Sequence, residues 1–390
     1  MLRLNPTLRS IGVLLSLLIV CLIGVIILRA SLRPSIIIGG KAPDVQINWD
    51  MPAADADQIS FSASGEQICT MSDDGLLKCY DRAGAEVFSA TIPGANRAII
   101  SPDGECTLVY AHRNPENKQL AFIDDKGEIC WRMNVASAIW SADADSDKTN
   151  AVFAVGTGEK RIYGVSVGKQ AKRFRRFKSS GVACSMTLDA SEDKIVYGTW
   201  QPSSIRAVNM HGRLIWENER DAASLQFVES PGNSDRILLR STPNRAGSDG
   251  EATLYEEDGK SLRRFTLSAS ESTNIMISPN GVFLCAGYSK MIEHAGKSMP
   301  QRHAALYDYF GRRMWDKGSM LLQVTPLLVN DSGFVLISDG KTTLFVVAPD
   351  GAIKQACELP SLLVRFVASQ DRSQALAECA DGRIYHLKIR

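Results

Sequence analysis

Hydrophobic residues follow two different patterns along the chain. Residues 10–28 form a run of nineteen residues without a charge, flanked by Arg9 and Arg29. After residue 44, short runs rich in Val, Ile, Leu, Phe and Tyr are broken by Gly, Asp, Asn and Ser about every eight to twelve residues, and no window keeps a helical apolar period. The first pattern predicts a membrane-spanning helix and the second predicts an all-β domain.

The uncharged run predicts an uncleaved membrane anchor. As a helix it would reach roughly 29 Å, close to the hydrocarbon thickness of a bilayer. It is longer than the usual apolar region of a cleaved secretory signal, about 7–15 residues, and no small-x-small cleavage site follows it. Lys and Arg lie on both sides, so their count does not decide the orientation, and we take an outward-facing domain as the default.

These boundaries divide the chain into four segments. We predict a short N-terminal tail over residues 1–9, a transmembrane helix over 10–28, a stalk over 29–43 and a β-domain over 44–390. Everything that folds into the domain therefore follows the anchor and is expected to lie close to one membrane face.

The β-domain contains an internal repeat in which a strand leads into a polar turn. Clear copies occupy residues 59–65 (Ile-Ser-Phe-Ser-Ala-Ser-Gly), 98–104 (Ala-Ile-Ile-Ser-Pro-Asp-Gly) and 275–281 (Ile-Met-Ile-Ser-Pro-Asn-Gly). Weaker copies lie around Asp145, Glu192, Asn233, Gly333 and Asp371. The spacing of the eight copies stays between 38 and 52 residues, which is typical of units of four strands with their turns.

A second series places a glycine turn before a later strand of each unit. Its members are Gly84, Gly127, Gly168, Gly212, Gly259, Gly311 and Gly351. Three of these turns continue as Gly-x-x-x-Trp, ending at Trp131, Trp216 and Trp315. The glycine can adopt a positive φ in a hairpin turn, and the tryptophan offers a large apolar face for packing between sheets.

The two series differ in number, eight against seven, because the last unit has room for only three strands, at residues 364–368, 374–378 and 384–389. Residues 44–50, which resemble the Trp-bearing strands, can supply the fourth. Such pairing would remove the free sheet edge and close a ring. We therefore predict an eight-bladed β-propeller closed by its N-terminal strand, with seven blades as the alternative.

The repeat resembles a known superfamily. The pattern Asp-x-x-Gly-x-x-x-Trp, at residues 124–131 and 308–315, is similar to the repeat of pyrroloquinoline-quinone-type propellers. That superfamily includes quinoprotein dehydrogenases and the propeller lipoprotein of the outer-membrane protein assembly machine. The Ser-Pro-Asp-Gly and Ser-Pro-Asn-Gly turns equally resemble WD40-like propellers. The resemblance implies a propeller over nearly all of residues 44–390, and it says little about function.

Composition and motifs narrow the function classes. The chain has 390 residues, 45% hydrophobic and 22% charged, with a formal net charge of +1, which argues against a disordered chain or a polybasic nucleic-acid binder. No two cysteines are adjacent and no dense set of Ca²⁺ ligands stands out, so a quinone-dependent oxidoreductase remains only an alternative. No hydrolase, phosphate-loop, metalloprotease or dithiol motif occurs. We predict no catalytic residue, metal or cofactor.

Two long connections form the candidate binding rim. Residues 240–251 in the fifth unit and 289–304 in the sixth both join a second strand to a third, so they should share one end of the propeller. Binding is one interpretation and tolerated surface insertion is the other, with equal weight. The candidate rim residues are Arg240, Asn244, Arg245, Asp249, His294, Lys297, Arg302 and His303.

One strongly basic run occupies residues 169–178 in the third unit, with six Lys or Arg in ten residues. Interleaved phenylalanines would suit lipid phosphates, an acidic partner or nucleic acid. We favour an exposed outer strand whose charges block sheet-to-sheet association. The candidate patch consists of Lys172, Arg173, Arg175, Arg176 and Lys178.

Two cysteines are placed to form a bridge. Cys69 and Cys79 lie on either side of the Asp73-Asp74-Gly75 turn at nearly equal distance, so they can face each other across a hairpin. An oxidising compartment would allow a disulfide between them.

The sequence as a whole favours a membrane-anchored, extracytoplasmic propeller that works as a non-enzymatic binding or scaffold module of the cell envelope. Its expected partners are the lipid bilayer, through the N-terminal helix, and a protein, with no nucleic acid. The alternatives are a quinoprotein oxidoreductase and a factor similar to the outer-membrane assembly lipoprotein.

Overall fold

The chain divides into two compact units, residues 1–38 and 39–390, and the account below concerns the second. The computed structural model describes residues 41–390 except 54–55, 64, 148–149, 169–171, 201, 220–223, 230–235, 243–249, 268–270, 295–296 and 320–323. The predicted tail, transmembrane helix and most of the stalk lie outside the described residues. Within the described part, no helix has the length and apolarity needed to cross a membrane.

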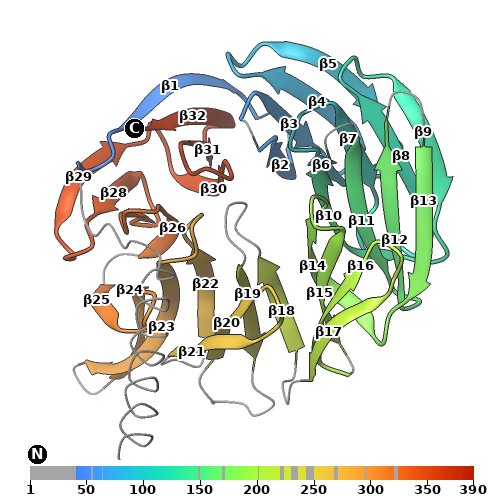
Figure 1. Cartoon of the computed structure of the whole chain (residues 1–390). Coiled ribbons are helices and arrows are strands. Elements are labelled where there is room, and N and C mark those ends of the chain that lie inside the picture. The colour runs from blue at the N-terminus through green and yellow to red at the C-terminus, as the bar shows by residue number, and fades with distance from the viewer. Residues whose placement is uncertain are drawn as a thin grey trace, which may run out of the picture. The chain divides into compact units, whose positions relative to one another are not determined.

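The described residues form eight four-stranded antiparallel sheets, the blades, which stand around a common centre (Figure 1). Blade one contains β2 (Gln58–Phe61), β3 (Gln67–Met71), β4 (Leu76–Asp81) and β5 (Glu86–Thr91). Blade two contains β6 (Arg97–Ile100), β7 (Cys106–Tyr110), β8 (Gln119–Asp124) and β9 (Ile129–Asn134). Blade three contains β10 (Ile139–Ser146), β11 (Ala151–Thr157), β12 (Arg161–Val167) and β13 (Lys172–Lys178). Blade four contains β14 (Val182–Asp189), β15 (Lys194–Trp200), β16 (Ser204–Asn209) and β17 (Leu214–Glu219).

The second half of the ring repeats this order. Blade five contains β18 (Ser224–Glu229), β19 (Arg236–Thr242), β20 (Gly250–Glu256) and β21 (Ser261–Leu267). Blade six contains β22 (Glu271–Ile277), β23 (Leu284–His294), β24 (Lys297–Tyr307) and β25 (Arg313–Ser319). Blade seven contains β26 (Thr325–Val329), β27 (Val335–Ser338), β28 (Thr343–Val347) and β29 (Ile353–Glu358). Blade eight contains β30 (Leu363–Ala368), β31 (Gln374–Cys379), β32 (Arg383–Ile389) and β1 (Val45–Pro52). The predicted all-β, eight-bladed propeller is confirmed.

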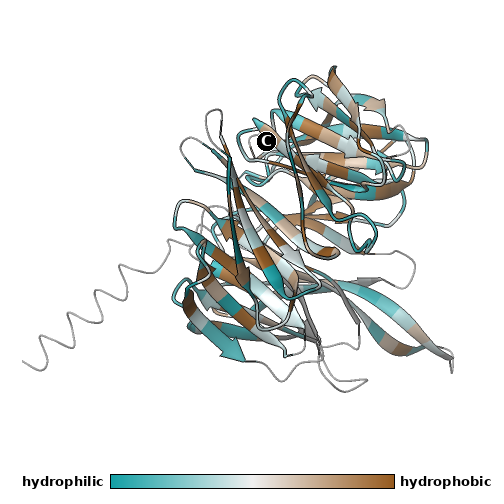
Figure 2. Cartoon of the chain, turned by 90° about the vertical axis from the view of Figure 1, so that its right-hand side faces the viewer, coloured by the Kyte–Doolittle hydropathy of each residue, from teal (hydrophilic) through white to brown (hydrophobic). Residues whose placement is uncertain are grey.

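Burial changes from the middle of a blade to its outer edge. Every residue of β11 is buried, because neighbouring blades cover both faces of a middle strand. Outer strand β13, in contrast, is exposed along nearly its whole length. Figure 2 shows hydrophobic and hydrophilic residues alternating along many strands, the pattern of strands with one buried face. The core therefore lies between blades.

The glycine turns explain how one blade docks on the next. At Gly127 an added Cβ would lie 2.7 Å from the ring of Phe88, which belongs to the preceding blade. At Gly259 it would lie 2.4 Å from the Trp216 ring, and the Trp216 indole donates to the Glu257 carbonyl at 2.7 Å. Gly127 and Gly259 adopt φ of 84° and 83° and also leave room for a large outer-strand side chain of the neighbouring blade. Gly168 is not among the glycines with positive φ.

Inner strands are tied to the next blade by hydrogen bonds from side chains to backbone. The Ser60 hydroxyl donates to the Ala98 carbonyl at 2.8 Å, joining blade one to blade two. Ser141 does the same to the Ala183 carbonyl at 2.8 Å, between blades three and four. These bonds satisfy backbone groups at the inner edge of a sheet, where no further strand can pair.

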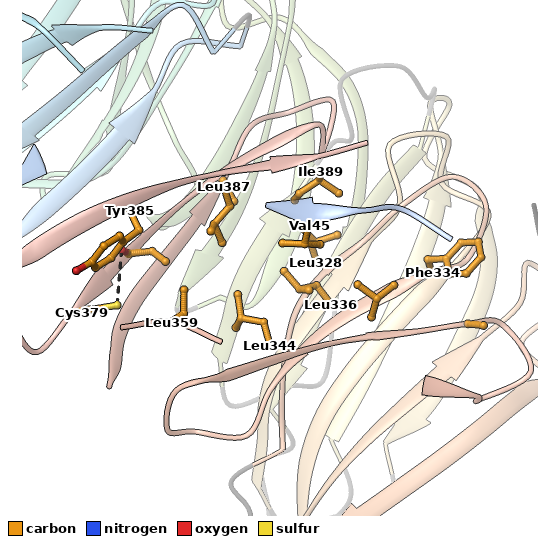
Figure 3. Packing of buried hydrophobic residues seen from close by; sticks show 14 residues of the cluster. Val45, Leu328, Phe334, Leu336, Leu344, Leu359, Cys379, Tyr385, Leu387 and Ile389 are labelled. Atoms are coloured by element: carbon orange, nitrogen blue, oxygen red, sulfur yellow. Dashed lines mark hydrogen bonds between the residues drawn. The ribbon is translucent and has the colours of Figure 1, made fainter. Parts of the chain in front are cut away.

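The first strand belongs to the last blade. β1 pairs antiparallel with β32, from Val45 opposite Ile389 to Pro52 opposite Arg383. Figure 3 shows Val45 pointing between Leu328 and Leu336 of blade seven and Ile389 of blade eight, all of which belong to one buried cluster. The two ends of the β-domain are therefore held in one sheet and packed into one core.

Candidate functional site

The blade-six connection predicted as a loop over residues 289–304 is instead part of a long hairpin. β23 and β24 pair over eleven residues each, from Leu284 opposite Tyr307 to His294 opposite Lys297. Neighbouring strands stop earlier, because β22 reaches only Ser289 and β25 reaches only Arg302. The hairpin thus continues beyond its sheet as a two-stranded ribbon made of residues 290–294 and 297–301. The loop prediction was wrong because a ribbon with no covering sheet lacks the apolar alternation by which strands are recognised.

The ribbon carries exposed apolar side chains. Met291 is 56% exposed and Met299 is 44% exposed. The two residues lie on the two paired strands of the ribbon, next to each other's pairing partner. Met291 pairs with Pro300, and Ile292 pairs with Met299. Lys290 is also exposed beside them. Paired residues share a face of a ribbon and successive residues alternate between faces, so Met291 lies with Pro300 on one face and Met299 lies with Ile292 on the other. Each face of the ribbon therefore presents one exposed methionine.

A polar network holds the base of the ribbon. The Tyr288 and His303 rings stack with centroids 4.9 Å apart, and His303 Nδ1 lies 2.8 Å from Asp316 Oδ1. Asp316 Oδ2 also accepts hydrogen bonds from the Tyr288 hydroxyl and, at 2.9 Å, from Arg313 Nη1. The other His303 ring nitrogen lies 3.0 Å from Gln301 Oε1. Three strands of blade six are therefore linked where the ribbon leaves the sheet.

Burial and close packing make this network rigid. Burial, and then the Asp316 carboxylate, raise the pKa of Tyr288, so the phenol stays protonated and keeps donating. Gly318 lies opposite His303 in β25, and a Cβ there would lie 2.4 Å from His303 Cε1. Only glycine leaves room for the imidazole in this position.

The remaining predicted rim residues fall at the edge of the described structure. The connection predicted over residues 240–251 is shorter than expected, because Arg240 lies in β19 opposite Ala252 and residues 250–251 begin β20. Asn244, Arg245 and Asp249 lie outside the described residues. Arg302 is half-buried in β24.

His294 and Lys297 end the ribbon, and their side chains, like that of Arg240, are not described. The structure therefore places His294, Lys297, Arg302 and His303 on one hairpin and Arg240 on the neighbouring blade. Among the described residues no group of three His, Cys, Asp or Glu side chains could hold a metal ion.

The basic run occupies outer strand β13, which has only β12 as a neighbour in its sheet. Alternate residues face opposite sides of a strand. Lys172 donates to the Cys130 carbonyl and the Phe174 ring lies 6.4 Å from Trp131, so this side faces blade two. Phe177 contacts Gly212 of blade four from the other side.

The five predicted patch cations are therefore divided between two faces. Lys172, Arg176 and Lys178 share the parity of Phe174, and Arg173 and Arg175 share that of Phe177. They do not form one continuous surface.

Cys69 and Cys79 form a disulfide in blade one. They are directly opposite each other in the β3–β4 pair, with Cα atoms 4.3 Å apart, and both are buried. This bond lies away from the ribbon and serves the core of the blade.

Sequence reasoning missed Tyr288, Arg313 and Asp316, the partners of His303. They lie on β23 and β25, on either side of His303 in β24, so only the strand register brings them together. No motif or spacing in the sequence connects these residues with His303.

Comparisons with known proteins identify the fold. No family model matches the chain, and no curated protein matches it. Among solved structures, the Dos1 propeller has 12% identity and a TM-score of 0.65, over 88% of this chain and 95% of that one. Sqt1 from Saccharomyces cerevisiae has 13% identity and a TM-score of 0.64, over 88% and 98%. BamB from Moraxella catarrhalis has 13% identity and a TM-score of 0.60, over 88% and 100%.

The chain has the β-propeller fold. At these identities the likeness establishes the architecture alone, and a function must come from the residues of this chain.

Proposed function

We propose that this chain is a membrane-anchored, non-enzymatic scaffold that binds a protein partner through the β23–β24 ribbon. The observation that carries the proposal is the pair of exposed methionines, Met291 and Met299, on an element that projects beyond its sheet. Exposed apolar groups on a projecting element favour a binding role, and methionine adapts its shape to a partner. The propeller fold shared with Sqt1 and BamB supports a scaffold.

The rigid base supports the same role. Tyr288, His303 and Asp316 link three strands, so the base of the ribbon is anchored to blade six. A pre-ordered element loses less conformational entropy on binding than a free loop would.

The membrane and compartment parts of the proposal rest on two features. Residues 10–28 have the length and apolarity of an anchor. The Cys69–Cys79 disulfide supports an oxidising compartment, because such bonds are rare in reducing ones. The β1–β32 pairing supports a ring closed by its N-terminal strand, which would begin directly after the stalk.

Site-specific photo-crosslinking tests the ribbon. A photoreactive phenylalanine analogue would replace Met291 or Met299 in cells, with Ile353 as the matched control because it is 58% exposed on outer strand β29. We expect protein adducts from positions 291 and 299 and none of the same mass from 353. Adducts of equal yield at all three positions, or none at the ribbon, would remove the basis of the proposal.

The compartment is tested by alkylating intact cells with a membrane-permeant thiol reagent before denaturation. Cys69 and Cys79 are buried, so the protein is then denatured and labelled a second time, with and without reductant. Labelling only after reduction supports an extracytoplasmic propeller. Labelling without reductant contradicts that placement and leaves the ribbon proposal to its own test.

A further inference from the structure

Blades two, three and four bring a cationic and aromatic cluster together at one end of the propeller. Arg113 lies in the connection between β7 and β8, Trp140 is the second residue of β10, and Trp200 ends β15. Connections between second and third strands share an end of the propeller with the connections between blades. The cluster therefore lies at the same end as the β23–β24 ribbon, on different blades.

The three side chains form a continuous surface. Arg113 Cζ lies 4.7 Å from the centroid of the Trp140 ring, in a cation–π contact. The Trp140 and Trp200 rings have centroids 6.3 Å apart and planes inclined at 46°. Trp200 is 42% exposed, and Arg113 is also exposed. The half-buried Trp140 therefore contacts an exposed guanidinium and an exposed indole.

The backbone holds this arrangement at a conformational cost. Arg113 has φ of 55°, a region that side chains other than glycine rarely adopt. Its N–H donates to the Ile139 carbonyl at 2.8 Å, and the His112 N–H donates to Asn96 Oδ1 at 2.8 Å. Gly158 lies under Trp140, where an added Cβ would be 3.1 Å from the indole Nε1. Strained backbone fixed by such bonds is concentrated at functional positions.

Two guanidinium groups lie close to His112 at this end of the propeller. Burial and then the Arg113 and Arg97 guanidiniums lower the pKa of His112 to about 4, so His112 is neutral at pH 7. None of the ion pairs formed among the described residues includes Arg97 or Arg113. Arg113, beside the aromatic surface, and Arg97, close to His112, can therefore pair with an external anion.

We propose that Arg113, Trp140 and Trp200 form a second binding site, specific for an acidic peptide segment with an aromatic side chain next to a carboxylate. The carboxylate would pair with Arg113, with Arg97 adding charge, and the aromatic side chain would pack on Trp200. A neutral sugar would stack on Trp200 but would leave both guanidiniums without an anion, so a peptide fits the charge better. This site is separate from the ribbon and goes beyond the scaffold role.

Fluorescence anisotropy with the full chain in nonionic detergent tests the proposal. The probe is a labelled peptide of about ten residues that alternates Glu and Phe, and its Gln–Phe counterpart is the charge control. We expect the acidic peptide to bind and its affinity to fall by about ten-fold or more in Arg113→Gln and in Trp200→Ala. The matched controls Arg175→Gln and Phe174→Ala, on exposed strand β13, should leave the affinity unchanged.

Several outcomes would overturn the site. These are no binding of the acidic peptide, equal binding of the Gln–Phe peptide, or full affinity in folded Arg113→Gln. If a neutral hexasaccharide displaced the labelled peptide as strongly as the unlabelled acidic peptide does, the ligand of this site would be a glycan and not a peptide.

Two further variants keep the test decisive. If Trp200→Ala does not fold, Arg113→Lys carries the test, because it keeps the charge but loses the planar contact with Trp140. Circular dichroism checks the fold of each variant. Combined Met291→Ser and Met299→Ser should leave peptide affinity unchanged, so failure of the ribbon proposal remains distinguishable from failure of this one.

Discussion

Blades one and two each contain two cysteines in the described structure, and their strand positions give the two pairs different chemistry. Cys69 and Cys79 lie on neighbouring strands β3 and β4, directly opposite each other, and form a disulfide. Cys106 lies in β7 and Cys130 in β9, with β8 between them. Two strand spacings amount to about 9–10 Å between Cα atoms. That exceeds the limit of about 7 Å for a disulfide without backbone movement.

The blade-two thiols nevertheless interact. Cys130 lies at a register shift opposite β8, and its thiol donates to the Phe122 carbonyl at 3.2 Å. A hydrogen bond from Cys106 lowers the pKa of Cys130, and nearby Lys172 adds to this, while the same interaction and burial raise the pKa of Cys106. The cysteines of blade one form a disulfide because their strands are neighbours. Those of blade two remain thiols that affect each other's pKa, because β8 lies between their strands.

Removing both cysteines of blade one should have the largest effect. Cys69→Ala with Cys79→Ala is expected to lower the free energy of unfolding by about 2–4 kcal/mol, because the bridge constrains the unfolded chain. Guanidinium unfolding of the full chain measures this. Cys106→Ala with Cys130→Ala should cost only about 1 kcal/mol. The comparison fails if the two double variants unfold at the same denaturant concentration.

The contact between the two blades gives the next effect. In Gly127→Ala the new Cβ meets Phe88, which lies opposite Cys79, so we expect a loss of about 2–3 kcal/mol. Gly382→Ala is the matched control, because Gly382 has φ of 74° but no atom within 4 Å of the added Cβ. It should lose only about 1 kcal/mol, from backbone strain. Equal thermal midpoints for the two variants would mean that the contact with Phe88 adds nothing.

Thiol reactivity should show a smaller, kinetic difference. Cys130 has a lowered pKa, so its reactive thiolate persists to lower pH than that of Cys357, whose pKa is raised by burial. Both are half-buried in outer strands. Alkylation at pH 7, followed by mass mapping, should modify Cys130 several-fold faster, by about three- to ten-fold. Lys172→Gln should reduce this advantage, and an unchanged rate ratio would exclude a role for the lysine.

The last prediction, with the smallest expected effect, is that Cys106 and Cys130 form no disulfide with each other. Treatment of the folded chain with a small disulfide oxidant should leave Cys106 and Cys130 unlinked, since β8 separates their strands. Peptide mapping without reductant would detect a Cys106–Cys130 crosslink. Its appearance in the folded protein would show that blade two can rearrange to the geometry of blade one.

The repeats were predictable because local turn chemistry is repeated. Polar turns such as that at Ser101, and the glycine turns, give the number of blades. The strands predicted for the last unit agree with β30, β31 and β32 to within one residue at each end. The reason for the turn glycines was predictable only in part. Their positive φ follows from the turn, whereas the contact of Gly259 with Trp216 depends on how successive blades dock.

The candidate sites were harder to predict, because they depend on contacts across strands and blades. His303 was singled out for its place in an insertion, but its partners Tyr288 and Asp316 required the register of three strands. Arg113, Trp140 and Trp200 come from three blades, and no spacing along the sequence connects them. The ribbon was misassigned because its strands have no sheet to cover them.

The pairing of β1 with β32 also constrains the order of folding during synthesis. Val45 leaves the ribosome long before Ile389, so β1 remains without its partner while seven blades are made. At a synthesis rate of about 5–20 residues per second, this interval lasts roughly 15–70 s. An unpaired strand is open to association with other chains throughout that time. In a propeller closed in this way, the first strand is therefore the segment that stays open to misassociation for longest, until the last strand arrives.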